Sequence, residues 1–419
     1  MAHSANILIF GEGISLAHVT RPLLLARELS SRGHRLHFVT GPCLCQWVNH
    51  HGMDATSVYT PDADAIYGRL RRLQPMYRAN ELEQCIDADL AVIRSVQPDV
   101  IVGDCRNSLR ISTELSGVPY AAITNANCTP WFSGSLSAPA GFALNRWLGK
   151  HRVDRYLVPL FGRAGRALVC RRLSGDFDRI HKRRGLTGSC RDFRQMFTSP
   201  QLNLIADLPQ LMPSRNLPGH CHYVGPLCWL SDPQHTGATR RLLDGISPAQ
   251  PLIYVTAGST GSPTLLATLA PLLGDLPCQF VVTTGTRRAA IDWPDNLHPI
   301  EFASAEPILK RAVAVISHGG SGSIYQALAS GLPAITVPGF FDQETQADQL
   351  EHCGLGLRLA EDNLASTLRP AVDRLLREPG FRDRAARFAQ LIDATDAPRA
   401  AADLVEALAA ASSVQPAAA

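Results

Sequence analysis

The sequence predicts an α/β protein with two Rossmann-like domains, each built on a parallel sheet, and a cleft between them. Short apolar runs alternate with amphipathic stretches, which is the pattern of strands joined by helical crossovers. The alternation restarts at Pro251, so the pattern occurs twice in the 419 residues. We expect a first domain over 1–235 and a second over 236–412, whose last helix can return to the first domain.

The first half opens with a strand at 6–10, a glycine-bearing turn and a helix over about 21–31. Pro22 suits the first turn of that helix and Gly33 suits its end. Further elements follow as a strand at 36–40, a strand at 99–103, a helix at 108–116 and a strand at 120–124. The stretch 133–194, rich in arginine and aromatic residues, predicts a pair of helices that cap this domain.

The second half predicts a strand at 252–256, a loop at 258–262 and a helix at 263–273, then strands at 279–283, 313–317 and 334–337. The preceding region, 231–250, contains Pro, Gly, Ser and Asp without a sustained period, which is typical of a linker.

Composition excludes several classes of protein. The net charge of +3, from 40 basic and 37 acidic residues, is too balanced for a dedicated nucleic-acid-binding protein. No apolar run approaches the roughly 18 residues that span a bilayer, and no signal peptide is visible, so we expect a cytoplasmic protein without membrane insertion. The eleven cysteines include no C-x-x-C pair, which favours reduced thiols over a metal site. Two D-x-D triplets, Asp62/Asp64 and Asp87/Asp89, are interpreted as solvated surface.

The most informative segment is the loop His318-Gly319-Gly320-Ser321-Gly322-Ser323, which follows an apolar strand and opens a helix. Unpaired N–H groups and the positive end of the dipole make such a helix start a natural phosphate site. The glycines allow close backbone approach, and His318, Ser321 and Ser323 add donors. The alternative is a glycine-rich turn that only packs strand on helix.

Two further segments follow strands of the same predicted sheet. Ser259 lies in a second Gly/Ser loop, and two such loops at one sheet edge fit a diphosphate better than one. Asp342 and Gln343 follow a later strand, where they could bind hydroxyl groups, although a helix cap is the simpler interpretation of this pair alone.

Other nucleotide and hydrolase motifs are missing. Gly11-Glu-Gly13 lacks the third glycine of G-x-G-x-x-G, and no acidic residue ends the second strand, which disfavours NAD. There is no G-x-x-x-x-G-K-[ST] loop and no G-x-S-x-G nucleophile elbow in a strand-to-helix setting.

In the first half, His18 lies just after the first strand and Asp104 lies at the tip of another. Strand tips of one parallel sheet share an edge, so these side chains could meet. A carboxylate beside an imidazole fixes its tautomer and stabilises the imidazolium, which makes histidine an effective general base. Either residue alone is more typical of capping or packing.

These residues resemble the family 1 glycosyltransferases, nucleotide-sugar-dependent enzymes of GT-B fold, and above all the bacterial type that acts on small-molecule natural products. The most specific string is His318-Gly-Gly-Ser-Gly-Ser323 with Ala327-Leu328, Gly331-Leu-Pro333, Pro338 and Asp342-Gln343. Ala17-His18-Val19 with Pro22, and Val102-Gly-Asp104 with Gly117-Val-Pro119, are similar to the family's first domain.

The resemblance implies an inverting transfer in which His18 deprotonates an acceptor hydroxyl and Asp104 orients His18. It places the donor diphosphate on Ser259 and the loop from His318 to Ser323, and the donor sugar on Asp342 and Gln343. It places the base and ribose at Phe302, Ala303 and Gln326. It implies no metal and no cofactor beyond a UDP- or dTDP-sugar co-substrate.

The sequence departs from the family pattern at four positions. Ala17 replaces the usual Gly before the histidine, and one extra residue, Arg21, separates His18 from Pro22. Gln326 replaces Glu at the ribose position, and Phe302 replaces Trp at the base.

The acceptor is expected to be a small, largely apolar molecule near 125–134, where Trp131 and Phe132 could line an apolar cleft or belong to the core. Three alternatives stay open. The first is a lipid or cell-wall precursor transferase, which a basic apolar patch at Arg146, Trp147, Lys150, Arg152 and Arg155 would favour. The others are a non-catalytic GT-B binding protein and a nucleotide-sugar epimerase, which would need carboxylates beyond Asp342. A monomer or a homodimer is expected.

Overall fold

The computed structural model describes residues 4–72, 74–134, 171–188, 190, 192–258, 260, 264–285 and 291–413, and the chain divides into two compact units. The first unit holds the described residues through Ser133, those from 171 to Leu227 and those from Asp396 onward; the second holds those within Cys228–Thr395. Of the expected helix pair over 133–194, residues 171–183 are helical, and 135–170, with the basic patch, lie outside the described residues.

The first unit is built on a seven-stranded parallel sheet in the order β3-β2-β1-β4-β5-β6-β7. Its strands are β1 (Asn6–Gly11), β2 (Arg35–Thr40), β3 (Ala55–Ser57), β4 (Val100–Asp104), β5 (Tyr120–Thr124), β6 (Leu202–Ile205) and β7 (Cys221–Tyr223). The strand order reverses between β1 and β4, and their register places Gly11 opposite Asp104. Such a switch point leaves a crevice beyond the carboxyl ends of the two strands.

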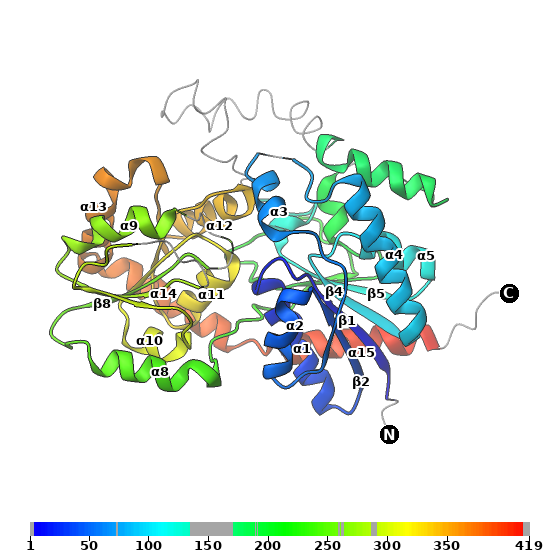
Figure 1. Cartoon of the computed structure of the whole chain (residues 1–419), viewed down its shortest axis with the longest axis horizontal. Helices are drawn as coiled ribbons and strands as arrows, with labels where there is room; N and C mark the ends of the chain where they lie inside the picture. The colour runs from blue at the N-terminus through cyan, green and yellow to red at the C-terminus, as the bar shows by residue number, and fades with distance from the viewer. Residues whose placement is uncertain are drawn as a thin grey trace. The chain divides into compact units, whose positions relative to one another are not determined.

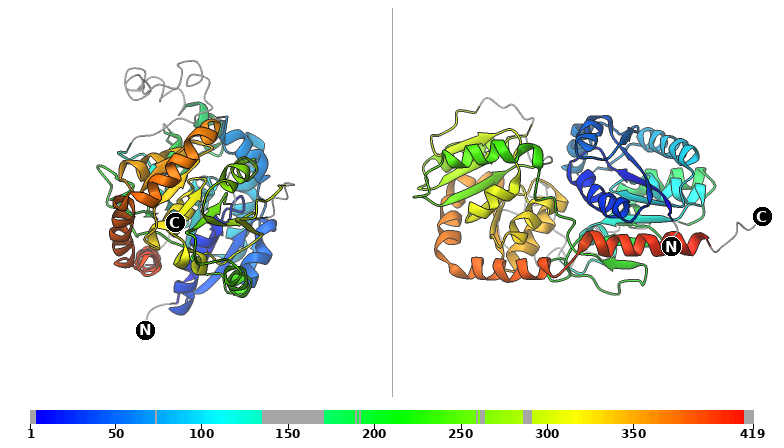
Figure 2. Two further views of the ribbon diagram at one scale, coloured as in Figure 1. Left: turned by 90° about the vertical axis from the view of Figure 1, so that its left-hand side faces the viewer. Right: turned by 90° about the horizontal axis from the view of Figure 1, so that it is seen from below.

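Helices cover both faces of this sheet (Figure 1). They are α1 (Ala17–Ser31), α2 (Pro42–His50), α3 (Ala63–Leu70), α4 (Ala79–Val96), α5 (Leu109–Ser116) and α15 (Ala397–Ser413), with 3-10 turns η1 (Ala126–Cys128) and η2 (Phe193–Phe197). Ile93 of α4 and Leu109 of α5 pack on the face that carries Leu8 and Phe10. The alternate residues of β1 point to the other face, where α1 and α15 lie side by side (Figure 2).

Helix α1 begins at Ala17, four residues before the predicted start, so Pro22 lies inside the helix and not in its first turn. A proline has no N–H to donate to the carbonyl four residues earlier. The helix therefore lacks the bond from position 22 to the His18 carbonyl, but it continues to Ser31 because its apolar residues are buried against the sheet. The earlier start places His18 on the first helical turn.

The second unit has a six-stranded parallel sheet in the order β10-β9-β8-β11-β12-β13. Its strands are β8 (Leu252–Thr256), β9 (Gln279–Thr283), β10 (Leu297–Ile300), β11 (Ala314–Ser317), β12 (Ala334–Thr336) and β13 (Gly356–Arg358). Its helices are α8 (Pro233–Asp244), α9 (Leu265–Gly274), α10 (Ala305–Arg311), α11 (Ser321–Ala329), α12 (Phe341–His352), α13 (Leu364–Arg377) and α14 (Pro379–Asp393), with a 3-10 turn η3 (Glu361–Asn363). The switch point of this sheet lies between β8 and β11.

The expected linker over 231–250 is wrong for most of its length, because α8 occupies it. Asp232 caps this helix by accepting from the Gln234 N–H at 3.1 Å, and Pro233 takes the first helical position. Only Thr239 and Leu243 are buried in α8, so the apolar period is too sparse to reveal the helix from sequence.

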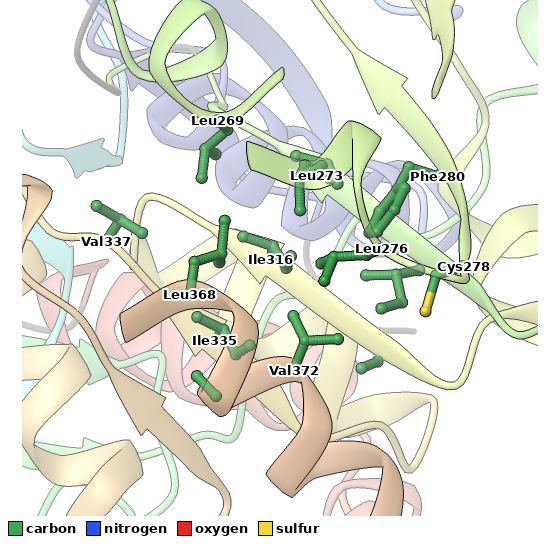
Figure 3. Packing of buried hydrophobic residues seen from close by; sticks show 14 of the residues in the cluster. Leu269, Leu273, Leu276, Cys278, Phe280, Ile316, Ile335, Val337, Leu368 and Val372 are labelled. Atoms are coloured by element: carbon green, nitrogen blue, oxygen red, sulfur yellow. The ribbon is translucent and has the colours of Figure 1, made fainter. Parts of the chain in front are cut away.

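One hydrophobic core cluster of the second unit lies between one face of its sheet and two helices. Leu269 and Leu273 of α9 and Leu368 and Val372 of α13 meet the same sheet face around Ile316 (Figure 3). Loops follow the carboxyl ends of β8 and β11, at Thr256 and Ser317.

Helix α15 is attached to the first unit by charged contacts as well as apolar ones. Arg32, at the end of α1, donates to Asp403 at 2.6 Å and to Glu406 at 2.8 Å. His34 contacts the other oxygen of Glu406 at 2.7 Å. Burial acts to raise the pKa of Glu406, but the hydrogen bonds from His34 and Arg32 outweigh it and lower that pKa.

We expect Glu406→Gln to destabilise the first unit by about 1 kcal/mol at pH 7, because charge-assisted hydrogen bonds become neutral ones. A lowered carboxyl pKa contributes stability above the ordinary value of 4.5, and that stability is lost as the pH falls through the folded value. The difference from wild type should therefore shrink in acid, which calorimetry at pH 7 and pH 4 would measure. Asp403→Asn, at a position 60% exposed, should cost less; equal stability of Glu406→Gln and wild type at pH 7 would contradict the interpretation.

Candidate active site

His18 and Asp104 meet at the switch point of the first sheet. Asp104 is the last residue of β4, and its carbonyl accepts from the Glu12 N–H at 3.2 Å. The His18 Nδ1 atom lies 2.9 Å from Asp104 Oδ1; the Asp104 side chain is fully buried, and 23% of the His18 side chain is exposed. A carboxylate only accepts, so this contact selects the tautomer with hydrogen on Nδ1 and leaves the Nε2 lone pair as the basic site.

A third residue, Arg21, belongs to this site, and no role was predicted for it. Its Nε donates to Asp104 Oδ2 at 2.7 Å and its Nη2 donates to Oδ1 at 2.6 Å. Burial acts against its charge, but Asp104 outweighs burial and raises the pKa of the guanidinium. Residues three apart lie on one face of a helix, so a helix that begins at Ala17 places Arg21 beside His18. The predicted helix begins at about 21, and for that reason the sequence did not bring the two residues together.

A second buried charge cluster lies beside the first. Arg106 donates to Asp89 Oδ1 at 2.7 Å and to Glu12 Oε2 at 3.3 Å, and the Tyr77 hydroxyl also donates to Glu12. Burial raises the pKa of both Glu12 and Asp89. The interpretation of Asp89 as solvated surface is therefore wrong, whereas Asp87, on the same helix, is 64% exposed.

The predicted phosphate loop lies at the switch point of the second sheet, between β11 and α11. Gly319 has φ +81°, and its N–H donates to the Ser317 hydroxyl at 3.2 Å. Ser321 begins α11, and the Ser323 hydroxyl donates to the Gly320 carbonyl at 2.9 Å. The loop therefore leads directly into the first turn of α11, as predicted. The Ser323 hydroxyl, predicted as a donor to phosphate, donates to the Gly320 carbonyl in this structure.

His318 is buried between glycines of two loops. A Cβ placed on Gly258, after β8, would lie 2.3 Å from the imidazole, and one placed on Gly320 would lie 2.4 Å from it. Any other residue at either position would displace the ring. Ser259 lies outside the described residues.

Gln343 connects the loops of this edge. Its side chain accepts from the Gly339 N–H at 2.8 Å and donates to the Thr260 hydroxyl at 3.2 Å, and the residue is 1% exposed. Asp342 is half-buried in the first turn of α12. Glu344 is buried and accepts from Arg358 at 2.7 Å.

Two of the residues expected at the base and ribose contact residues in α8 and in the segment just before it. Phe302 is 44% exposed and stacks on the His235 ring, with centroids 5.6 Å apart, and Ala303 is half-buried. Gln326 donates to the Trp229 carbonyl at 2.6 Å.

The two aromatic residues expected near the acceptor pack within the first unit. Phe132 is buried and forms an isolated bridge with Ser214, and Trp131 meets the His220 ring edge-on, with centroids 6.0 Å apart.

Within the described ranges, no group of three or more His, Cys, Asp or Glu residues could hold a metal ion. Every cysteine in that part of the chain is a free thiol. No helix of the described chain has the length and apolar character needed to cross a membrane.

We expect Gly320→Ala to destabilise the second unit by about 1–3 kcal/mol, because the added methyl overlaps the buried His318 ring. Gly322→Ala is the matched control: it lies two residues away, inside α11, and its added Cβ meets nothing within 4 Å. An alanine there should be neutral or stabilising by about 0.5–1 kcal/mol. Thermal unfolding measures both, and equal stability of the two variants would show that Gly320 does not confine His318.

Comparison with known proteins agrees with this architecture. Residues 267–408 match the family model described as "Erythromycin biosynthesis protein CIII-like, C-terminal domain". A PGL/p-HBAD biosynthesis glycosyltransferase of Mycobacterium tuberculosis is 31% identical over 396 residues, which cover 93% of this chain and 89% of the relative. A PGL/p-HBAD biosynthesis rhamnosyltransferase of Mycobacterium bovis is 30% identical over 389 residues, with 93% and 84% covered.

Solved structures share the fold. The calicheamicin glycosyltransferase CalG4 is 22% identical with a TM-score of 0.67, and the match covers 99% of this chain and 100% of that one. The glycosyltransferase VinC, solved in complex with dTDP, is 20% identical with a TM-score of 0.64, over 97% and 99% of the two chains. The predicted family resemblance and the GT-B fold are confirmed: the chain belongs to the family 1 glycosyltransferases and is a glycosyltransferase.

Proposed function

We propose that this transferase moves a sugar from a UDP- or dTDP-sugar to a hydroxyl of a small, largely apolar acceptor, with inversion at the anomeric carbon. The observation that carries the proposal is the 2.9 Å contact between His18 Nδ1 and the buried Asp104 carboxylate. That contact leaves Nε2 of a partly exposed imidazole as a base at a sheet edge where ligands bind. The similar structure solved with dTDP supports a nucleotide donor.

In the proposed mechanism, His18 Nε2 takes the acceptor proton as the acceptor oxygen bonds to the anomeric carbon. The bond from that carbon to the diphosphate oxygen breaks on the opposite face, so one displacement inverts the centre. Asp104 stabilises the imidazolium that forms. A positioned base of this kind contributes a factor of about 10²–10⁴ in rate.

The donor diphosphate is proposed to bind the loop from His318 to Ser323. Its support is the glycine backbone that leads from β11 into the first turn of α11, where N–H groups and the helix dipole favour an anion. The same groups meet the charge that grows on the leaving diphosphate, so the proposal assigns no step to a metal ion. Exposed Phe302 is proposed to stack on the base.

For the donor sugar we propose Asp342 and Gln343, which lie together in the first turn of α12. The Gln343 side chain contacts Gly339 and Thr260, which fixes its position at the strand-end loops. Asp342 is half-buried at the start of α12, where a carboxylate can accept from sugar hydroxyls.

A lipid or cell-wall precursor is the second candidate acceptor. The relatives named for PGL/p-HBAD biosynthesis favour it, because they match over nearly the whole chain. Sedimentation with anionic liposomes tests it: binding that salt weakens would favour this acceptor class over a small soluble one.

We expect His18→Ala to lower kcat by about 10²–10⁴ while leaving the binding of dTDP or UDP unchanged, since the residue removes a proton and does not hold the donor. The matched control is His50→Ala, an exposed histidine of α2, which should keep full activity. Transfer assays on purified variants measure both. Full activity of His18→Ala would remove His18 from the role of base.

We expect UDP- or dTDP-sugars, but neither NAD nor ATP, to raise the melting temperature. A ligand at 100 times its Kd adds about 2.7 kcal/mol to stability. Ser321→Ala, at the start of α11, should reduce this shift by weakening the diphosphate contact. An equal shift with ATP, or no shift with any nucleotide sugar, would contradict the donor assignment.

A further inference from the structure

The Arg21 guanidinium contacts both members of the His18–Asp104 pair. It holds each oxygen of Asp104 with one hydrogen bond, and its Nη2 lies 3.2 Å from His18 Nδ1. Nη2 and the protonated Nδ1 are both donors, so this last approach is not a hydrogen bond. Only 10% of the Arg21 side chain is exposed, and its charge is therefore weakly screened.

This arrangement has two consequences for His18. The two hydrogen bonds fix the plane of the Asp104 carboxylate, so that Oδ1 faces Nδ1 and holds the ring in one orientation. The guanidinium charge beside the ring also opposes a second positive charge there, which weakens the imidazole as a base. A histidine paired with a carboxylate alone would lack this opposition.

Asp207 lies behind Arg21 and supplies a compensating charge. Arg21 Nη1 donates to Asn125 Oδ1 at 2.7 Å, and Asn125 Nδ2 donates to Asp207 Oδ1 at 3.1 Å. The other Asp207 oxygen accepts from the Ala126 N–H at 2.6 Å, and the residue is fully buried. The two carboxylates, Asp104 and Asp207, carry two negative charges and the Arg21 guanidinium carries one positive charge. One negative charge therefore remains, and protonation of His18 would neutralise it.

We propose that Arg21 and Asp207 are positioning residues that set the proton affinity of His18 in opposite directions, Arg21 lowering it and Asp207 raising it. The inference rests on the proposed role of His18 as the base. Other ionisable groups beside this cluster are Glu12, from the loop after β1, Arg106, which contacts Glu12, and Cys105, which follows Asp104. The charge of Arg21 also acts on the Cys105 thiol, whereas Asp207→Asn keeps that charge in place.

The test is an NMR titration of the ligand-free full chain carrying histidine labelled with ¹³C at Cε1, with the His18 signal identified by its loss in His18→Gln. We expect Arg21→Gln to raise the pH midpoint of the His18 titration by about one unit, because a charge in contact with the ring is removed. Asp207→Asn should lower the midpoint by a smaller amount, because Asp207 acts from beyond Asn125.

Arg27→Gln is the matched control, since it removes the same charge from an exposed position of the same helix and should leave the midpoint unchanged. Arg21→Lys keeps the charge but loses the two-pronged contact, so its midpoint should stay near wild type while kcat falls and the acceptor KM does not change. Circular dichroism checks folding, and Arg21→Lys with Asp207→Asn carry the test if Arg21→Gln does not fold.

An unchanged or lowered midpoint in Arg21→Gln, an equal shift in Arg27→Gln, or an unchanged midpoint in Asp207→Asn would overturn the inference. The titration requires no turnover. Failure to find any transfer activity would therefore count against the proposed function and not against the coupling of these charges.

Discussion

The Asp104 carboxylate imposes the constraint on which the first unit depends. An ionised carboxylate that is fully buried is costly by several kcal/mol unless charge partners and hydrogen bonds satisfy it. Both partners, His18 and Arg21, come from α1, so satisfying Asp104 attaches the start of that helix to the tip of β4. The same contact fixes the orientation of the His18 imidazole, which is therefore a consequence of how the fold compensates one buried charge.

In the neighbouring cluster, buried carboxylates are also paired with an arginine, but all the paired side chains are closed off from solvent. Arg106 is buried between Glu12 and Asp89, and burial raises the pKa of both carboxyls. The Ser112 hydroxyl donates to the second Asp89 oxygen, and the Tyr77 hydroxyl donates to the Glu12 oxygen that Arg106 also contacts. One end of the sheet therefore carries two clusters of paired charges. One includes the partly exposed His18, and the other is fully buried.

At the switch point of its sheet, the second unit has glycine-rich loops, whereas the first unit has charged side chains at the corresponding place. Its switch point is formed by glycines that enclose His318 and by a loop that opens α11. Gln343 holds the strand-end loops together through Gly339 and Thr260. A rigid arrangement of N–H groups suits a ligand with spread negative charge, whereas proton removal requires one titratable group in a defined state.

The sequence by itself determined the two parallel sheets, because apolar runs and turn residues are local signals, and most predicted strands lie within a residue of their observed bounds. It also determined the glycine loop and the meeting of His18 with Asp104, since strand tips of one sheet share an edge. Only the tertiary structure decided that Arg21 holds Asp104, that Asp89 is buried, and that α8 replaces a linker. These depend on burial and on contacts across as many as 83 positions, which no local period encodes.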